Sequence, residues 1–157
     1  MQKWKICSLA LALGLSLTAC GGGEAETQQS YDPEAATQAL LDSGAFSEQL
    51  ESIDAGMAQN YFGLDAAPQE AAVYGSTGAT AETAAMLVFD SEETASAAAD
   101  NLEVWIEDQK AACEGYLPAE IPKLDSAILD QAGNSVVLVV AGDYDKAQAA
   151  LDGLEEG

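Results

Sequence analysis

The strongest structural signal in the chain lies in residues 126–141, which read SAILDQAGNSVVLVVA. Strand-forming residues flank Ala132-Gly133-Asn134, and glycine and asparagine favour a tight turn. The segment therefore predicts a β-hairpin with strands over residues 126–130 and 135–141. The run 136–140 is apolar without alternation, so its strand is expected at the centre of a sheet or buried on both faces.

A second hairpin is predicted earlier in the chain, with strands over residues 71–76 and 84–90. The second of these strands contains the short apolar run AMLVF. A connection of small residues, TGATAE, joins the two strands across residues 77–82.

Two helical segments are predicted before the hairpins. Asp32 is a good N-cap and Pro33 suits the first helical position, and Gly44 is expected to end this helix. A second helical stretch is expected after Ser47, because apolar residues recur there at spacings of three and four: Leu50, Ile53, Met57 and Tyr61.

Two more helices follow. The capping-box pattern of residues 90–93 predicts an amphipathic helix of about 24 residues that ends near Gly115, with Trp105 as its main core residue. Residues 116–122 contain two prolines and are predicted to be an ordered non-helical crossover. A last helix is expected over residues 144–151, capped by Asp143.

The expected order is therefore α-α-β-β-α-β-β-α. It predicts an α+β fold, a four-stranded, largely antiparallel sheet with helices packed on one face. We expect a single domain over residues 32–154, since a chain of 157 residues is short for two domains.

Charge and composition exclude several functions. The chain has 27 acidic residues, five basic residues that are all lysine, and no histidine. Without histidine there is no Ser-His-Asp or Cys-His catalytic arrangement and no imidazole metal ligand. With a net charge of −22 the protein should be repelled by phosphate backbones, so no nucleic-acid partner is expected.

The N-terminus predicts export. Residues 1–20 read MQKWKICSLALALGLSLTAC, which is a basic start followed by an apolar run too short to span a membrane. The ending Leu17-Thr18-Ala19-Cys20 resembles the lipobox of bacterial lipoproteins, in which the cysteine is acylated after cleavage before it. We therefore expect a signal peptide over residues 1–19, a lipidated Cys20 with a flexible tether over 20–31, and an extracytoplasmic domain held to the cell membrane.

Beyond the lipobox, several further segments are similar to a family of small lipoproteins from Gram-positive bacteria that is catalogued only as a domain of unknown function. The resemblance implies a lipid anchor and an extracytoplasmic address, and it carries over no catalytic or binding residues. This chain departs from the family by using alanine where relatives tend to have lysine. The segments are GAFS (44–47), YFGLD (61–65), YGSTGATAE (74–82), IEDQK (106–110), YLP (116–118), IPKL (121–124) and Gly133-Asn134.

One loop is a candidate ligand-binding site: Ser76, Thr77, Gly78 and Thr80. Glycine permits close approach of main-chain groups to a ligand, and the hydroxyl groups add donors and acceptors. The alternative is an ordinary connection between two strands, which we favour on general grounds. The loop lacks the Gly-Lys-Ser/Thr of a phosphate-binding loop.

The other candidates have simpler explanations. Cys113 lies near a predicted helix C-terminus beside Glu114, which favours a neutral, semi-buried thiol. The adjacent acidic pairs fit helix caps and solvated surfaces, so no catalytic residue is assigned. No metal site is expected, because no calcium-binding loop is present, and no cofactor is assigned.

The resulting prediction is a membrane-anchored, extracytoplasmic lipoprotein that acts as a non-enzymatic binding or envelope-interaction module. Its expected partners are the membrane, through the lipid on Cys20, and an unknown envelope protein or small ligand. The alternative is a small hydrolase that uses two carboxylates on envelope material.

Overall fold

The computed structural model describes residues 32–155. The predictions for residues 1–31, including the signal peptide, Cys20 and the tether, lie outside the described residues. In chain order the elements are α1 (Pro33–Asp42), β1 (Glu51–Ile53), the 3-10 helix η1 (Ala55–Met57), α2 (Ala58–Phe62), β2 (Glu70–Gly75), β3 (Thr83–Val88), α3 (Glu92–Cys113), the 3-10 helix η2 (Pro118–Glu120), α4 (Ile121–Asp125), β4 (Ile128–Ala132), β5 (Ser135–Val140) and α5 (Tyr144–Glu155).

The strands form one antiparallel sheet in the order β1-β2-β3-β5-β4. The two predicted hairpins are β2–β3 and β4–β5, and β3 pairs with β5 at the centre. Gly133 has a φ of 59° in the second hairpin turn, a conformation that suits glycine. The α+β class is confirmed, but the sheet has five strands instead of the four expected.

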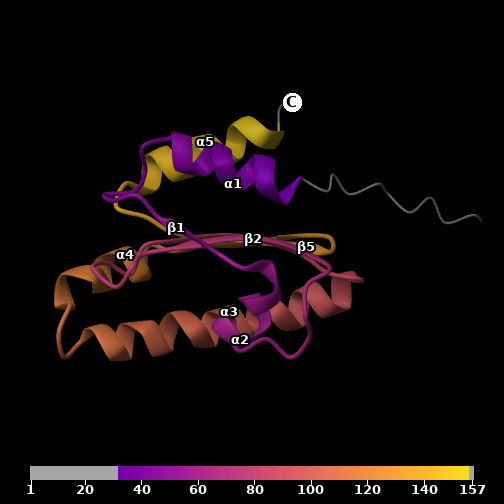
Figure 1. Ribbon diagram of the computed structural model, residues 1–157, viewed down its shortest axis with the longest axis horizontal. Coiled ribbons are helices and arrows are strands. Elements are labelled where there is room, and N and C mark those ends of the chain that lie inside the picture. The colour runs from indigo at the N-terminus through magenta and orange to yellow at the C-terminus, as the bar shows by residue number, and fades with distance from the viewer. Residues whose placement is uncertain (1–31, 156–157) are drawn as a thin grey trace, which may run out of the picture.

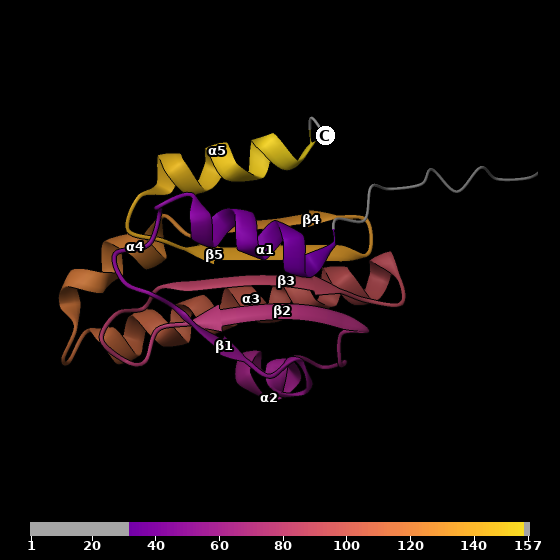
Figure 2. The same ribbon diagram turned by 45° about the horizontal axis from the view of Figure 1, so that its top comes forward.

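Helices cover both faces of this sheet. Figures 1 and 2 show α1 and α5 on one face and α2 and α3 on the other. The prediction of helices on one face is therefore wrong. The physical reason lies in β3, where all six residues are buried: apolar side chains on both sides of a strand need cover on both faces.

The larger core lies between the sheet and α3. Leu102 and Trp105 of α3 pack there with Leu87 and Leu138 from the central strands. The Trp105 side chain also meets Phe62 edge to face, with ring centroids 5.2 Å apart. Trp105 is buried, as predicted.

The smaller core lies beneath α1 and α5 and includes Leu40, Val139 and Ala147. The caps of both helices are as predicted: Asp32 Oδ1 accepts from the N–H of Ala35, and Asp143 Oδ1 accepts from the N–H of Lys146. By contrast, α3 is capped by Ser91, one residue after the position expected from the capping-box pattern.

The predicted second helix is largely replaced by β1. Ile53 lies in this edge strand, opposite Val73 of β2, and α2 covers only residues 58–62. Pairing with the open edge of β2 supplies the main-chain hydrogen bonds that a helix would have supplied, which explains why helical spacing alone misled the prediction.

The crossover over residues 116–122 was also wrongly predicted to be non-helical. It contains η2 and the start of α4. Pro118 and Pro122 each occupy the first turn of one of these elements, where a missing N–H costs little. Two short helical turns in succession accommodate both prolines.

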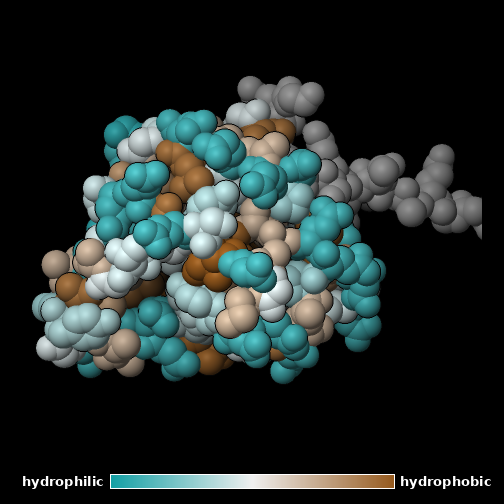
Figure 3. Space-filling model, in the orientation of Figure 1, coloured by the Kyte–Doolittle hydropathy of each residue, from teal (hydrophilic) through white to brown (hydrophobic). Residues whose placement is uncertain are grey.

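The face shown in Figure 3 is largely hydrophilic, with hydrophobic residues in separate patches. Within residues 32–155, no helix has both the length and the apolar character needed to cross a membrane.

Candidate functional site

The predicted binding loop lies between β2 and β3 and folds around the side chain of Ser76. The main-chain N–H groups of Gly78 and Thr80 donate to Ser76 Oγ at 3.1 and 3.0 Å. Ser76 Oγ and Thr80 Oγ1 in turn donate to Glu48 Oε1 at 2.5 and 2.6 Å. Thr77 and Gly78 remain exposed at the tip.

The ionised carboxylate of Glu48 holds this loop in place through these hydrogen bonds. The hydrogen bonds from Ser76 and Thr80 lower the pKa of the Glu48 carboxyl, with a smaller contribution from the charge of Lys123. The hydroxyl protons of Ser76 and Thr80 are thus used within the protein. A ligand at this loop would meet chiefly main-chain groups and Thr77.

A buried ionic cluster lies directly behind the loop and was not predicted. Lys123 Nζ is 3.1 Å from Glu82 Oε1 and 3.0 Å from Glu120 Oε2. The Glu82 side chain is fully buried, and that of Glu120 is 11% exposed. We call Glu82, Glu120 and Lys123 the lysine cluster.

Main-chain and hydroxyl donors complete the lysine cluster. Glu82 accepts from the N–H of Ser47 at 2.9 Å and from Ser47 Oγ at 2.8 Å. Glu120 accepts from the N–H of Ala81 at 3.0 Å. Each carboxylate is therefore paired with the ammonium and with further donors, as buried charge requires.

Local structure explains how the sequence brings these groups together. Residues 120 and 123 are three apart across the start of α4, so their side chains lie on one side of that helix. Gly142 makes room for the cluster, since a Cβ there would lie 2.8 Å from Glu82 Oε1. The α1–β1 connection, the start of β3 and α4 are thereby joined.

Lys123 stays charged in this setting. Partial burial lowers its pKa, but the hydrogen bonds with Glu120 and Glu82 and the charges of these carboxylates outweigh burial and raise it. Because both oxygens of Glu82 and Oε2 of Glu120 accept from protein donors, the cluster is suited to bracing the fold rather than to acid–base chemistry.

A small hollow opens beside the loop. It has a volume of about 140 Å³, and Ser76, Gly78 and Thr80 form one wall. Aromatic residues from other elements also line it: Tyr61, Trp105 and Tyr116. We call this feature the aromatic hollow. The structure thus joins three of the four predicted loop residues to an aromatic surface.

Two of these aromatic residues are accessible. The exposed fraction is 39% for Tyr61 and 69% for Tyr116, whereas Trp105 is 9% exposed. The rings of Tyr61 and Trp105 have centroids 6.0 Å apart, and burial raises the pKa of the Tyr61 hydroxyl. The two tyrosines therefore stand at the surface beside a buried tryptophan.

Cys113 also contributes to the aromatic hollow, as a buried free thiol. Burial, followed by the negative charge of Glu120, raises the pKa of this thiol. These surroundings favour the neutral form and agree with the interpretation of Cys113 as a small apolar residue.

Among the described residues, no group of three or more His, Cys, Asp or Glu side chains is arranged to hold a metal ion.

Comparisons with known proteins identify the family to which the chain belongs. No curated protein and no solved structure matches the chain. The model of a family described as a domain of unknown function (DUF4358) matches residues 42–141, which include the sheet, the loop, the lysine cluster and the aromatic hollow. The chain therefore belongs to the DUF4358 family.

Proposed function

We propose that the protein is a membrane-anchored extracytoplasmic lipoprotein whose domain binds an envelope partner or small ligand without catalysing a reaction. The lipobox at Cys20 supports the address. The aromatic hollow supports the binding role, because it joins exposed main-chain groups to accessible aromatic rings.

The observation that carries the binding role is the exposure of two tyrosines, Tyr61 and Tyr116, that line the same hollow. Tyrosine offers a large apolar ring with a polar end and loses little conformational entropy on binding, so it is enriched at recognition sites. A side chain or a small polar group from a partner fits a hollow of about 140 Å³.

Pre-organisation adds to this argument. Glu48 holds the loop from one side, and Glu120 holds the N–H of Ala81 from behind. A loop that is already ordered does not lose further conformational freedom when it binds. The bonds that occupy Ser76 and Thr80 therefore position the wall of the hollow.

The carboxylate-dependent hydrolase remains the alternative. Glu82 and Glu120 are the carboxylates that share Lys123, yet both are buried and bonded to protein donors. Catalysis would require a carboxylate that reaches a substrate, which is the reason to prefer binding.

Photo-crosslinking in the producing cell tests the binding role. A photoreactive amino acid at Thr77, the exposed residue between Ser76 and Gly78 of the hollow, should capture a defined partner, whereas the same group at Asp108 on the exposed side of α3 should not. Tyr116→Ala should reduce capture from position 77, and Tyr144→Ala provides the matched control because Tyr144 is 46% exposed on α5. Equal capture in the two variants would contradict a role for the aromatic hollow.

A further inference from the structure

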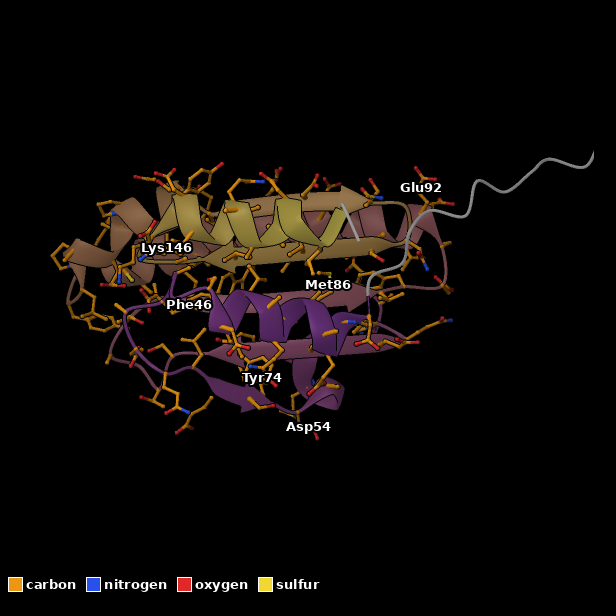
Figure 4. The ribbon with its side chains drawn as sticks, turned by 90° about the horizontal axis from the view of Figure 1, so that it is seen from above. Phe46, Asp54, Tyr74, Met86, Glu92 and Lys146 are labelled. Atoms are coloured by element: carbon orange, nitrogen blue, oxygen red, sulfur yellow. The ribbon has the colours of Figure 1, made fainter. Side chains whose placement is uncertain are left out.

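A second cavity lies on the other face of the sheet, beneath α5. Its volume is about 280 Å³. The apolar part of the wall comes from β3, β4, β5 and α5: Met86, Ile128, Val137, Leu151 and Leu154. Figure 4 shows Met86 between α1 and α5 when the molecule is viewed from the helical side. We call this space the α5 cavity.

The sequence explains why this space is not filled. Ser135 and Ala132 are opposite each other in the β4–β5 register, so two small side chains occupy adjacent positions on the sheet. These small side chains on the sheet leave a gap that the leucines of α5 do not close.

Ser135 carries the first observation that indicates a ligand. Its hydroxyl lines the α5 cavity and is buried, with the residue only 3% exposed. Among residues 32–155, Ser135 Oγ has no hydrogen-bond partner. A buried hydroxyl in a native protein almost always has a partner, so this one is available to a molecule in the cavity.

The second observation that indicates a ligand is negative charge at the α5 cavity. Asp130 and Asp152 also line the α5 cavity. Asp130 is opposite Val137, two residues from Ser135 along β5, which places Asp130 and Ser135 diagonally on the same face of the sheet. Asp152 accepts a hydrogen bond from Gln148 Nε2 at 2.8 Å.

No lysine of the described residues forms an ion pair with either aspartate. Lys110 pairs with Glu107 and Asp125, Lys123 belongs to the lysine cluster, and Lys146 pairs with Asp143. The cavity thus combines an apolar interior and a buried, unpartnered hydroxyl with two exposed carboxylates that no lysine neutralises. A cation with an apolar body matches all three.

We infer that the α5 cavity binds a small amphipathic cation, a primary ammonium group attached to a hydrocarbon body. The hydrocarbon lies among Met86, Val137 and Leu151, and the ammonium donates to Ser135 Oγ and to the carboxylate of Asp130. At about 30 Å³ for each small heavy-atom group, the volume accepts a ligand of roughly seven to ten such groups. This site is separate from the aromatic hollow and does not depend on the proposed partner or on the lipid anchor.

Methionine methyl NMR tests this inference directly on the full chain. Met86 lines the cavity, whereas Met57 lies in η1 and is 53% exposed, so the two methyl groups serve as reporter and internal control. Substitution of Met57 and of Met86 by leucine, one at a time, assigns their signals among those of the three methionines of the chain. The probe is hexylammonium at neutral pH, compared with neutral hexanol and anionic hexanoate of the same chain length.

We expect hexylammonium to shift the Met86 methyl signal saturably and to leave Met57 in place. Hexanol should bind at least about tenfold more weakly, and hexanoate should not bind, because the charge-assisted bonds are lost or reversed. Asp130→Asn should weaken hexylammonium about tenfold, whereas the matched control Asp108→Asn on α3 should not. Ser135→Ala removes only an unpartnered hydroxyl, so this variant should fold and also bind more weakly.

Three results would overturn the inference. One is an unchanged Met86 signal at millimolar hexylammonium, which would mean that the cavity holds water only. Another is equal binding of hexylammonium and hexanol, which would mean that charge has no part in recognition. The third is an unchanged affinity in both Asp130→Asn and Ser135→Ala, since binding would then occur elsewhere.

Discussion

Replacement of Lys123 by methionine is the most informative perturbation of the fold. Methionine keeps an unbranched side chain of similar length but removes the ammonium that joins Glu82 to Glu120. Two buried carboxylates would then share one region without a counterion. Removal of one partner from a buried ion pair costs about 3–5 kcal/mol.

The structure places this variant near the lower end of that range. Lys123 is 20% exposed, so water already screens part of the interaction, and Glu82 keeps its bonds to Ser47. We therefore expect Lys123→Met to lower the free energy of unfolding by about 3 kcal/mol at neutral pH. Lys146→Met is the matched control: Lys146 is 56% exposed beside Asp143, and a surface pair is worth about 0–1 kcal/mol.

The assay is urea unfolding at neutral pH, followed by circular dichroism. A loss equal to that of Lys146→Met would refute our description of the lysine cluster as a brace.

Three further predictions follow from the packing and the charge. Gly142→Ala should lower the free energy of unfolding in urea by about 1–3 kcal/mol, because its Cβ would lie 2.8 Å from Glu82 Oε1. An unchanged urea midpoint would contradict the close packing of the lysine cluster against Gly142. Trp105→Ala should cost about 3–5 kcal/mol in the same assay, since the ring is buried in the larger core, and a neutral effect would contradict that packing. Moderate salt should raise the melting temperature measured by calorimetry, because it screens repulsion among the 27 acidic residues; a melting temperature that does not change with salt would contradict this.

Local patterns were enough to predict most elements but not their arrangement. Short-range sequence patterns correctly predict the central strands, α3 and the caps at Asp32 and Asp143. The run 136–140 predicted a strand at the centre of the sheet or buried on both faces, and burial on both faces requires cover on both. The prediction of helices on one face did not follow that signal through, and the sequence does not show which helix covers which face.

The β1 strand illustrates how tertiary pairing overrides a local pattern. Leu50, Ile53 and Met57 have helical spacing, yet Ile53 pairs with Val73 at the edge of the sheet. Only three residues form the strand, and no alternation of three residues can be distinguished from chance. The open edge of β2, invisible in the sequence, decides the outcome.

The candidate site likewise has one part that the sequence predicts, the loop, and one part that it does not, the lysine cluster. The loop was predicted because its glycines, serine and threonines are adjacent in sequence. Glu82 and Lys123 are 41 residues apart, and no local pattern connects them. The one available signal was the position of Glu82 between Ala81 and the buried start of β3, where a charged residue needs a partner.

The intact mass of the native protein purified from its membrane tests the central claim most directly. We predict a chain that begins at Cys20, lacks residues 1–19 and carries a diacylglycerol-sized addition on that residue. A chain that keeps residues 1–19 and carries no acyl mass would contradict the anchored, extracytoplasmic function that we propose.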